Sequence, residues 1–152
     1  MFDRIAQSVT YQQLELNAPI TVTVKRLDRI HPQISGNKFF KLKYNFLEAQ
    51  QQGFKKVLTF GGAYSNHIAA TAYAAQLFGF ASVGIIRGEE LKDKALNHTL
   101  ATAQQLGMHL HFISRQHYRE KNSPVFLEQL QQHYPEHYLI PEGGTNILAI
   151  QG

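Results

Sequence analysis

Two short segments combine a glycine-containing turn with polar side chains at the expected start of a helix. One is Ser35-Gly36-Asn37-Lys38, and the other is Gly61-Gly62-Ala63-Tyr64-Ser65-Asn66-His67. The free backbone N–H groups and the dipole at a helix start attract anions. Both segments are therefore candidate anion sites, although Ser35 and Ser65 could equally serve only as helix caps. Neither segment matches the G-x-G-x-x-G or G-K-[ST] nucleotide-binding patterns.

Lys38 is the candidate nucleophile. It is expected at the first position of a helix, where the positive end of the dipole helps to lower the pKa of an amine. A nucleophilic lysine must be partly neutral, so this position suits such a role. The alternative is an ordinary exposed lysine, and the local pattern does not decide between the two.

The histidine pairs predict no metal site. His109 and His111 lie two apart on an expected strand and share a face, but no third ligand stands at a useful spacing. His133 and His137 are four apart, with Pro135 between them. We therefore expect no bound metal. His67 differs because it follows Ser65-Asn66 directly, and we place it with them as a candidate substrate-binding residue.

Strands alternating with helices are expected to position these segments. The expected strands cover residues 21–27, 56–60, 81–86, 108–113 and 138–140. The expected helices cover residues 38–52, 65–78, 94–106 and 124–132. This order predicts an α/β fold, an open three-layer αβα arrangement with a mostly parallel sheet of about four strands. The second glycine segment follows the carboxyl end of a strand, where open parallel sheets bind ligands.

Length and composition describe an ordinary globular chain. Its 152 residues suffice for one domain, with 43% hydrophobic and 17% charged residues and a net charge of +4. The basic residues are scattered without arginine–aromatic interleaving, so we expect no nucleic-acid partner. There is no cysteine, which excludes disulfides and a thiol nucleophile. No stretch has the length of a membrane span or the pattern of a signal peptide, so we predict a cytoplasmic protein without a membrane partner.

Residues 35–43 and 59–67 together resemble two signatures of one family. This is the 1-aminocyclopropane-1-carboxylate deaminase / D-cysteine desulfhydrase family, a branch of the tryptophan-synthase-β-like, fold type II pyridoxal-phosphate (PLP) enzymes. The family pattern is G-N-K-x-x-K-L, followed about twenty residues later by G-G-x-x-S-N-H at a helix start. The similarity continues through residues 83–89 and 138–146, and so covers most of the chain beyond residue 20.

The resemblance implies a role for each site residue. Lys38 would hold pyridoxal 5'-phosphate covalently and act as the general base, while Asn66 would contact the phenolic oxygen of the cofactor. Ser65 would receive the substrate carboxylate with the neighbouring N–H groups, beside Asn66 and His67, and Lys41 would reach the cofactor phosphate. The catalytic residues would thus be Lys38 and Ser65, and the cofactor-binding residues Lys38, Asn66 and Lys41.

The implied activity is that of a deaminase, lyase or hydrolase acting on a small amino acid. The substrate is either 1-aminocyclopropane-1-carboxylate, opened to 2-oxobutanoate and ammonia, or D-cysteine, which loses sulfide. Because family enzymes are longer, the resemblance implies that residues 1–42 are an incomplete segment of the large domain and residues 43–152 the small α/β domain. We expect the chain alone to be an inactive part of an enzyme that is a homodimer at full length.

Two other functions stay open. One is a non-catalytic α/β module that binds a small molecule or PLP through the helix-start anion sites, without covalent attachment to Lys38. The other is a plain interaction domain of flavodoxin-like layout, which predicts neither. A flavodoxin-like phosphate loop does not fit Asp28-Arg29-Ile30-His31-Pro32, the segment after the first expected strand.

Overall fold

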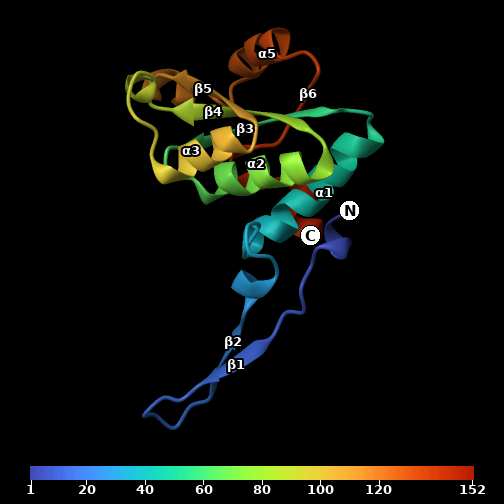
Figure 1. The fold of residues 1–152 in the computed structure, drawn as a ribbon, viewed down its shortest axis with the longest axis vertical. Helices are drawn as coiled ribbons and strands as arrows, with labels where there is room; N and C mark the ends of the chain where they lie inside the picture. The colour runs from blue at the N-terminus through green and yellow to red at the C-terminus, as the bar shows by residue number, and fades with distance from the viewer.

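The computed structural model describes the whole chain, residues 1–152 (Figure 1). The strands are β1 (Tyr11–Leu14), β2 (Val22–Lys25), β3 (Lys56–Gly62), β4 (Ala81–Arg87), β5 (Met108–Ile113) and β6 (His137–Leu139). The helices are α1 (Asn37–Gln51), α2 (Asn66–Phe78), α3 (His98–Gln105), α4 (Arg115–Arg119), α5 (Pro124–His133) and α6 (Ile147–Gln151). Short 3-10 turns are η1 (Phe2–Arg4), η2 (Leu27–Arg29), η3 (Glu89–Leu91) and η4 (Glu142–Gly144). No helix is both long and apolar enough to cross a lipid bilayer.

The main sheet has four strands in the order β5-β4-β3-β6, and every neighbouring pair is parallel. The central strands β3 and β4 pair over seven residues, from Lys56 with Ala81 to Gly62 with Arg87. β6 pairs with β3 over only three residues. In β3 the five residues from Val57 to Gly61 are all buried, as expected for a parallel strand covered on both faces. The predicted parallel sheet is confirmed.

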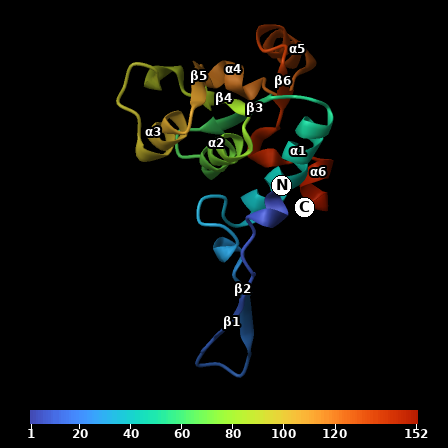
Figure 2. The same cartoon turned by 45° about the vertical axis from the view of Figure 1, so that its right-hand side comes forward.

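Helices cover both faces of this sheet, so the predicted three-layer αβα arrangement is also confirmed (Figure 2). On one face, Ile68 and Ala72 of α2 and Leu100 of α3 pack in one cluster with Ile86 and Met108 of the strands. The opposite face carries a second cluster, which joins strand residues to α4 and α5. Its members are Leu58, Phe60, Val83, Ile85 and Tyr118, with Phe126, Leu127 and Leu130 packed against them.

The N-terminal segment packs against α1 and α2 through a few apolar side chains. The ring of Phe2 lies edge-on to Phe39 at 5.2 Å between centroids and close to Phe78 at 4.9 Å. Phe2, Ile34, Phe39 and Phe46 are fully or almost fully buried in the same cluster. The predicted boundary between residues 42 and 43 falls inside α1, which is one continuous helix from Asn37 to Gln51.

A β-hairpin formed by β1 and β2 projects from the body of the molecule (Figure 1). The two strands are antiparallel, and Tyr11 lies opposite Lys25. The sequence predicted only the second strand of this hairpin. That strand was expected over residues 21–27, whereas β2 covers only Val22–Lys25. β1 was missed because all four of its residues are exposed, and its central Gln12 and Gln13 give no alternation of apolar and polar residues.

Three helix starts differ from the prediction. The helix expected from residue 65 begins at Asn66, because Ser65 is its cap. The helix expected at residue 94 begins at His98, because the side chain of Asn97 accepts a hydrogen bond from the Leu100 N–H at 3.0 Å and caps it there. α1 begins at Asn37, with Gly36 at the cap position in a backbone conformation of positive φ, 62°. Lys38 is therefore the second helical residue and not the first. Ser35 does not cap α1, since no side-chain cap is formed there.

Candidate functional site

Lys38 and Asn66 line one cavity, although 27 residues separate them in the sequence. The cavity has a volume of about 340 Å³ and is lined by Gln33, residues 35–38, Asn66, Ala69 and Ala70. The starts of α1 and α2 therefore meet at the same space, as the resemblance to the family implied. No acidic side chain lines the cavity, so its walls suit an anionic ligand.

The amine of Lys38 is in a half-buried setting with a neutral partner. Its Nζ donates a hydrogen bond to Oδ1 of Asn37 at 3.1 Å. Burial lowers the pKa of Lys38, and the positive charge of Lys41 lowers it further. A lysine with a lowered pKa exposes a neutral amine more often, which is the condition for nucleophilic or general-base chemistry.

Ser65 caps α2 and so fixes the turn before Asn66. Its Oγ accepts a hydrogen bond from the Ile68 N–H at 3.3 Å, which leaves its own proton free for a ligand. The turn comes so close to β3 that a Cβ on Gly61 would lie 2.8 Å from that Oγ and would overlap Ile68. Glycine at position 61 is thus required by this approach. Asn66, the first residue of α2, is exposed toward the cavity.

His67 points the other way, into the protein. Its side chain is almost fully buried, and its Nε2 lies 2.8 Å from the hydroxyl of Thr59. Thr59 donates its own proton to the carbonyl oxygen of Ile140 at 2.9 Å. The Thr59 oxygen must then accept from His67, so the imidazole carries its proton on Nε2.

The imidazole of His67 is held neutral. Burial lowers its pKa to about 3, with smaller contributions from the positive charges of Lys38 and Lys41. Its Nδ1 is buried and has no hydrogen-bond partner in the protein. The structure therefore places His67 behind the start of α2, as a support for Ser65 and Asn66, and outside the lining of the cavity.

Lys41 also lies outside the lining of the cavity. Its Nζ donates to the hydroxyl of Thr145 at 2.9 Å, in the segment that follows η4. A Cβ on Gly144, whose φ is 69°, would lie 3.3 Å from Cβ of Lys41 and 3.4 Å from Cε1 of His67. The end of the chain thus packs closely behind both residues. Sequence reasoning assigned no role to Thr59 or Thr145, because only the fold brings them here.

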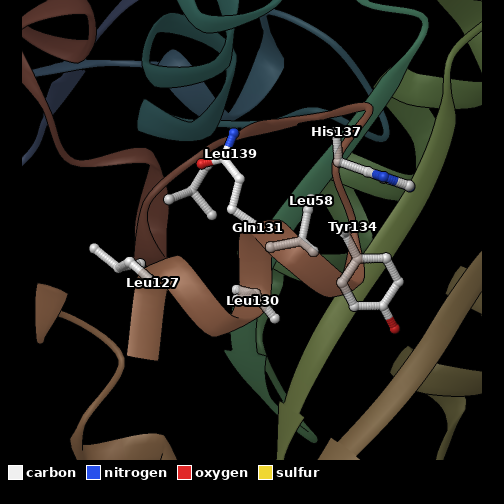
Figure 3. A pocket seen from close by; sticks show the side chains of 7 residues that line it. All are labelled: Leu58, Leu127, Leu130, Gln131, Tyr134, His137 and Leu139. Carbon is white, nitrogen blue, oxygen red and sulfur yellow. The ribbon is translucent and has the colours of Figure 1, made fainter. Parts of the chain in front are cut away.

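A second small pocket lies between α5 and the sheet (Figure 3). It is lined mainly by apolar side chains, among them Leu58, Leu130 and Leu139, and its volume is about 10 Å³. This is room for no more than one water molecule. The described chain also holds no group of three or more histidine or acidic side chains placed to bind a metal ion. The cavity at Lys38 is the better candidate for chemistry.

The residues at this cavity fit pyridoxal phosphate. They offer a half-buried lysine of lowered pKa and two helix starts that favour an anion. The volume lies at the low end of the roughly 300–1,000 Å³ found for small-molecule sites.

The fold and the site define an α/β domain of the kind found in fold type II PLP enzymes. In agreement, the crystal structure of a homologue of aminocyclopropane-carboxylate deaminase matches the chain with a TM-score of 0.74 and 25% identity. The match covers 95% of this chain and 45% of that one.

Sequence relatives identify the branch. The chain is 34% identical over 136 residues to the bifunctional D-cysteine desulfhydrase / 1-aminocyclopropane-1-carboxylate deaminase of Arabidopsis thaliana mitochondria. It is 35% identical over 133 residues to a Thermotoga maritima protein provisionally named as a 1-aminocyclopropane-1-carboxylate deaminase. The chain belongs to the aminocyclopropane-carboxylate deaminase / D-cysteine desulfhydrase family, as its two motifs indicated.

The matched regions cover 85% and 86% of this chain but only 34% and 42% of those two relatives. No protein-family model matches the chain. The expectation of a hydrolase is wrong in detail, because the names of the relatives are those of a deaminase and a desulfhydrase.

Proposed function

We propose that this chain supplies Lys38, Ser65 and Asn66 to a PLP-dependent deaminase or lyase that acts on a small amino acid. The observation that carries the proposal is the shared cavity, in which the half-buried amine of Lys38 and the amide of Asn66 face one space at two helix starts. Membership of the family supports the same reading.

Each side chain has a task that follows from its position. Lys38, with its lowered pKa, holds the cofactor through Nζ and moves a proton at that same atom. Pyridoxal phosphate, when bound, supplies an electron sink for the bond that breaks at the substrate. Ser65 offers its free hydroxyl proton, and the backbone N–H groups at the start of α2 add to it, so together they orient the carboxylate of the amino acid.

Asn66 and Lys41 complete the proposed cofactor contacts. The exposed amide of Asn66 presents a donor at the cavity wall, where the phenolic oxygen of the cofactor would accept it. Lys41 would turn from Thr145 to the phosphate group, a movement that its flexible stem permits. His67 supports the turn from the protein interior through its contact with Thr59, while Ser65 and Asn66 contact the substrate.

The names of the relatives support two substrates, 1-aminocyclopropane-1-carboxylate and D-cysteine. Both are small amino acids whose carboxylate fits a helix start. The chain spans about two-fifths of the length of the Thermotoga relative. We infer that residues outside this span contribute to the choice between the two substrates.

Covalent labelling tests the proposal directly. The chain would be incubated with PLP, reduced with borohydride and digested, and the added mass located by mass spectrometry. We expect the label on Lys38 at substoichiometric PLP, and its loss without redistribution in Lys38→Ala. Lys55→Ala is the matched control, since Lys55 is exposed and lies outside the cavity, and it should label as the unmodified chain does.

The labelling result also separates the alternatives. Saturable PLP binding without label on Lys38 would favour a non-catalytic binding module. Label spread evenly over the exposed lysines would contradict any cofactor site in this chain. The assignment to domains at residue 42, the homodimer, the cytoplasmic location and the inactivity of the isolated chain stay predictions.

A further inference from the structure

Besides the cavity at Lys38 and the small pocket under α5, a second cavity lies at the carboxyl ends of β3 and β4 and has a volume of about 300 Å³. Its walls are residues 62–64, Arg87, Leu91, residues 94–97, Leu100 and Arg115. It shares no lining residue with the cavity at Lys38. The two cavities meet the same turn, one at residues 62–64 and the other at Asn66. The connection from β4 to α3, which forms much of this cavity, runs along the edge of the domain in Figure 1.

The charge of this second cavity is positive. Arg87, Lys94 and Arg115 line it, and no acidic side chain does. Arg115 is already paired, because its Nε and Nη2 both donate to Glu90, at 2.9 and 2.7 Å. Arg87 and Lys94 form no ion pair with an acidic side chain. Two of its three cations therefore remain available to an anion.

Arg87 is exposed, and its guanidinium lies at the cavity wall near two other groups. Its Nη2 lies 3.5 Å from the position that a Cβ on Gly62 would take, so the guanidinium rests against the turn before Ser65. On the other side, its Cζ lies 5.6 Å from the centre of the Tyr118 ring, a cation–π contact. The planar fork of a guanidinium can bind a carboxylate through two N–H groups with little loss of freedom per hydrogen bond.

The apolar half of the wall selects the kind of anion. Six of the eleven lining residues are hydrophobic, including Leu91, Leu96 and Leu100. Inorganic phosphate would gain nothing from these side chains, whereas a short carbon chain would bury surface against them. We propose that this cavity binds a small organic acid, with a carboxylate on Arg87 and Lys94 and its carbon chain on the leucines.

Occupancy of this cavity would reach the turn beside the candidate active site. The side chain of Asn97 lines the cavity, caps α3 and donates a hydrogen bond to the carbonyl oxygen of Ala63 at 2.9 Å. Ala63 is two residues before Ser65. A ligand here would thus contact the segment that sets the position of Ser65 without using any residue of the Lys38 cavity.

The test is a titration of the isotope-labelled chain with succinate, followed by amide chemical shifts in NMR. We expect saturable shifts confined to the residues of the cavity wall, which are 62–64, 87, 91, 94–97, 100 and 115. Arg87→Gln and Lys94→Gln should each weaken binding roughly five- to tenfold, as expected for loss of a charge-assisted hydrogen bond. Lys92→Gln is the matched control, because Lys92 is exposed and close in sequence but lies outside the cavity wall, and it should leave the affinity unchanged.

Two further ligands make the result decisive. Neutral succinamide should produce no saturable shifts, and inorganic phosphate should bind more weakly than succinate. Equal affinities for phosphate and succinate would overturn the assignment to an organic acid. Shifts that survive in both Arg87→Gln and Lys94→Gln, or that spread over all exposed lysines, would overturn the site itself. None of these outcomes depends on PLP, so the proposed enzyme function stands or falls separately.

Discussion

The Nε2 atom of His67 lies 2.8 Å from the hydroxyl of Thr59, at a place where both side chains are buried. The Thr59 hydroxyl in turn donates a hydrogen bond to the carbonyl oxygen of Ile140, which is 81 positions later in the chain. A buried donor that loses its partner costs more free energy than the hydrogen bond itself contributes. The start of α2, and with it Ser65 and Asn66, is thereby connected to the segment that follows β6, the edge strand beside β3.

Replacement of Thr59 tests this connection. Thr59→Val keeps the shape of the side chain but leaves the Nε2–H of His67 and the carbonyl of Ile140 without a partner. We expect the free energy of unfolding to fall by about 1–3 kcal/mol in urea denaturation. Thr23→Val, at an exposed position of β2, should change it by less than about 0.5 kcal/mol. Equal effects of the two substitutions would contradict a stabilising role for the buried hydrogen bonds that join His67, Thr59 and Ile140.

Acid should destabilise the protein through His67. The ordinary pKa of histidine is 6.5, and burial lowers that of His67 to about 3, so the unfolded chain takes up a proton that the folded chain refuses. The stability that follows from neutral His67 is present above pH 6.5 and is lost as the pH falls toward 3. Between pH 7.5 and pH 5 the loss should be about 2 kcal/mol, measured by urea denaturation at each pH.

A variant without this titration isolates the contribution of His67. His67→Gln cannot take up the proton, so its stability should fall less over the same pH range. The pKa values of His31, His111 and His137 are also lowered by burial, but these residues are present in both proteins and cancel in the difference. Parallel pH profiles for the two proteins would show that His67 is not the group that titrates.

The two glycines before the Ser65 turn should respond differently to a methyl group. Gly61→Ala would press a Cβ into Ile68 and within 2.8 Å of the Ser65 hydroxyl, and we expect a loss of about 1–3 kcal/mol in unfolding free energy. Gly62→Ala meets only the Arg87 guanidinium, at 3.5 Å, and should cost less than about 0.5 kcal/mol. Urea denaturation compares the pair, and a reversed order would contradict the close approach of α2 to β3.

Ser65 should have a structural effect that can be separated from ligand binding. Ser65→Ala removes the cap at Ile68 N–H and should lower the unfolding free energy by about 1 kcal/mol. Ser65→Asn keeps a capping oxygen and should restore most of that loss. The matched pair is measured by thermal denaturation without any ligand. An unchanged melting temperature in Ser65→Ala would mean that the cap contributes nothing to α2.

Local patterns were sufficient for the sheet and for the two halves of the site. The strands β3 and β4 are short apolar runs between glycines, and the motif that opens α2 is a glycine turn followed by a capping serine. Such signals depend on neighbours in sequence, so they could be interpreted before the fold was known. The meeting of Lys38 with Asn66 was implied only by the resemblance of both motifs to one family.

The supporting contacts could not be predicted in the same way. The acceptor of the Thr59 hydroxyl, the carbonyl of Ile140, is beside β3 because β6 pairs with that strand, and β6 pairs over only three residues. The hydrogen bond from Lys41 to Thr145 spans 104 positions. No periodicity in the sequence encodes such pairs, because they arise only once the strand order is set.

The strand order has a consequence for folding of the chain during its synthesis on the ribosome. Of the four strands in the main sheet, β3 is synthesised first and its neighbour β6 last. The acceptor at Ile140 follows β6. A nascent chain that has not yet reached Ile140 holds Thr59 and His67 without the final link of their relay. The turn that carries Ser65 and Asn66 therefore gains this last hydrogen-bonded connection only after Ile140 has been translated.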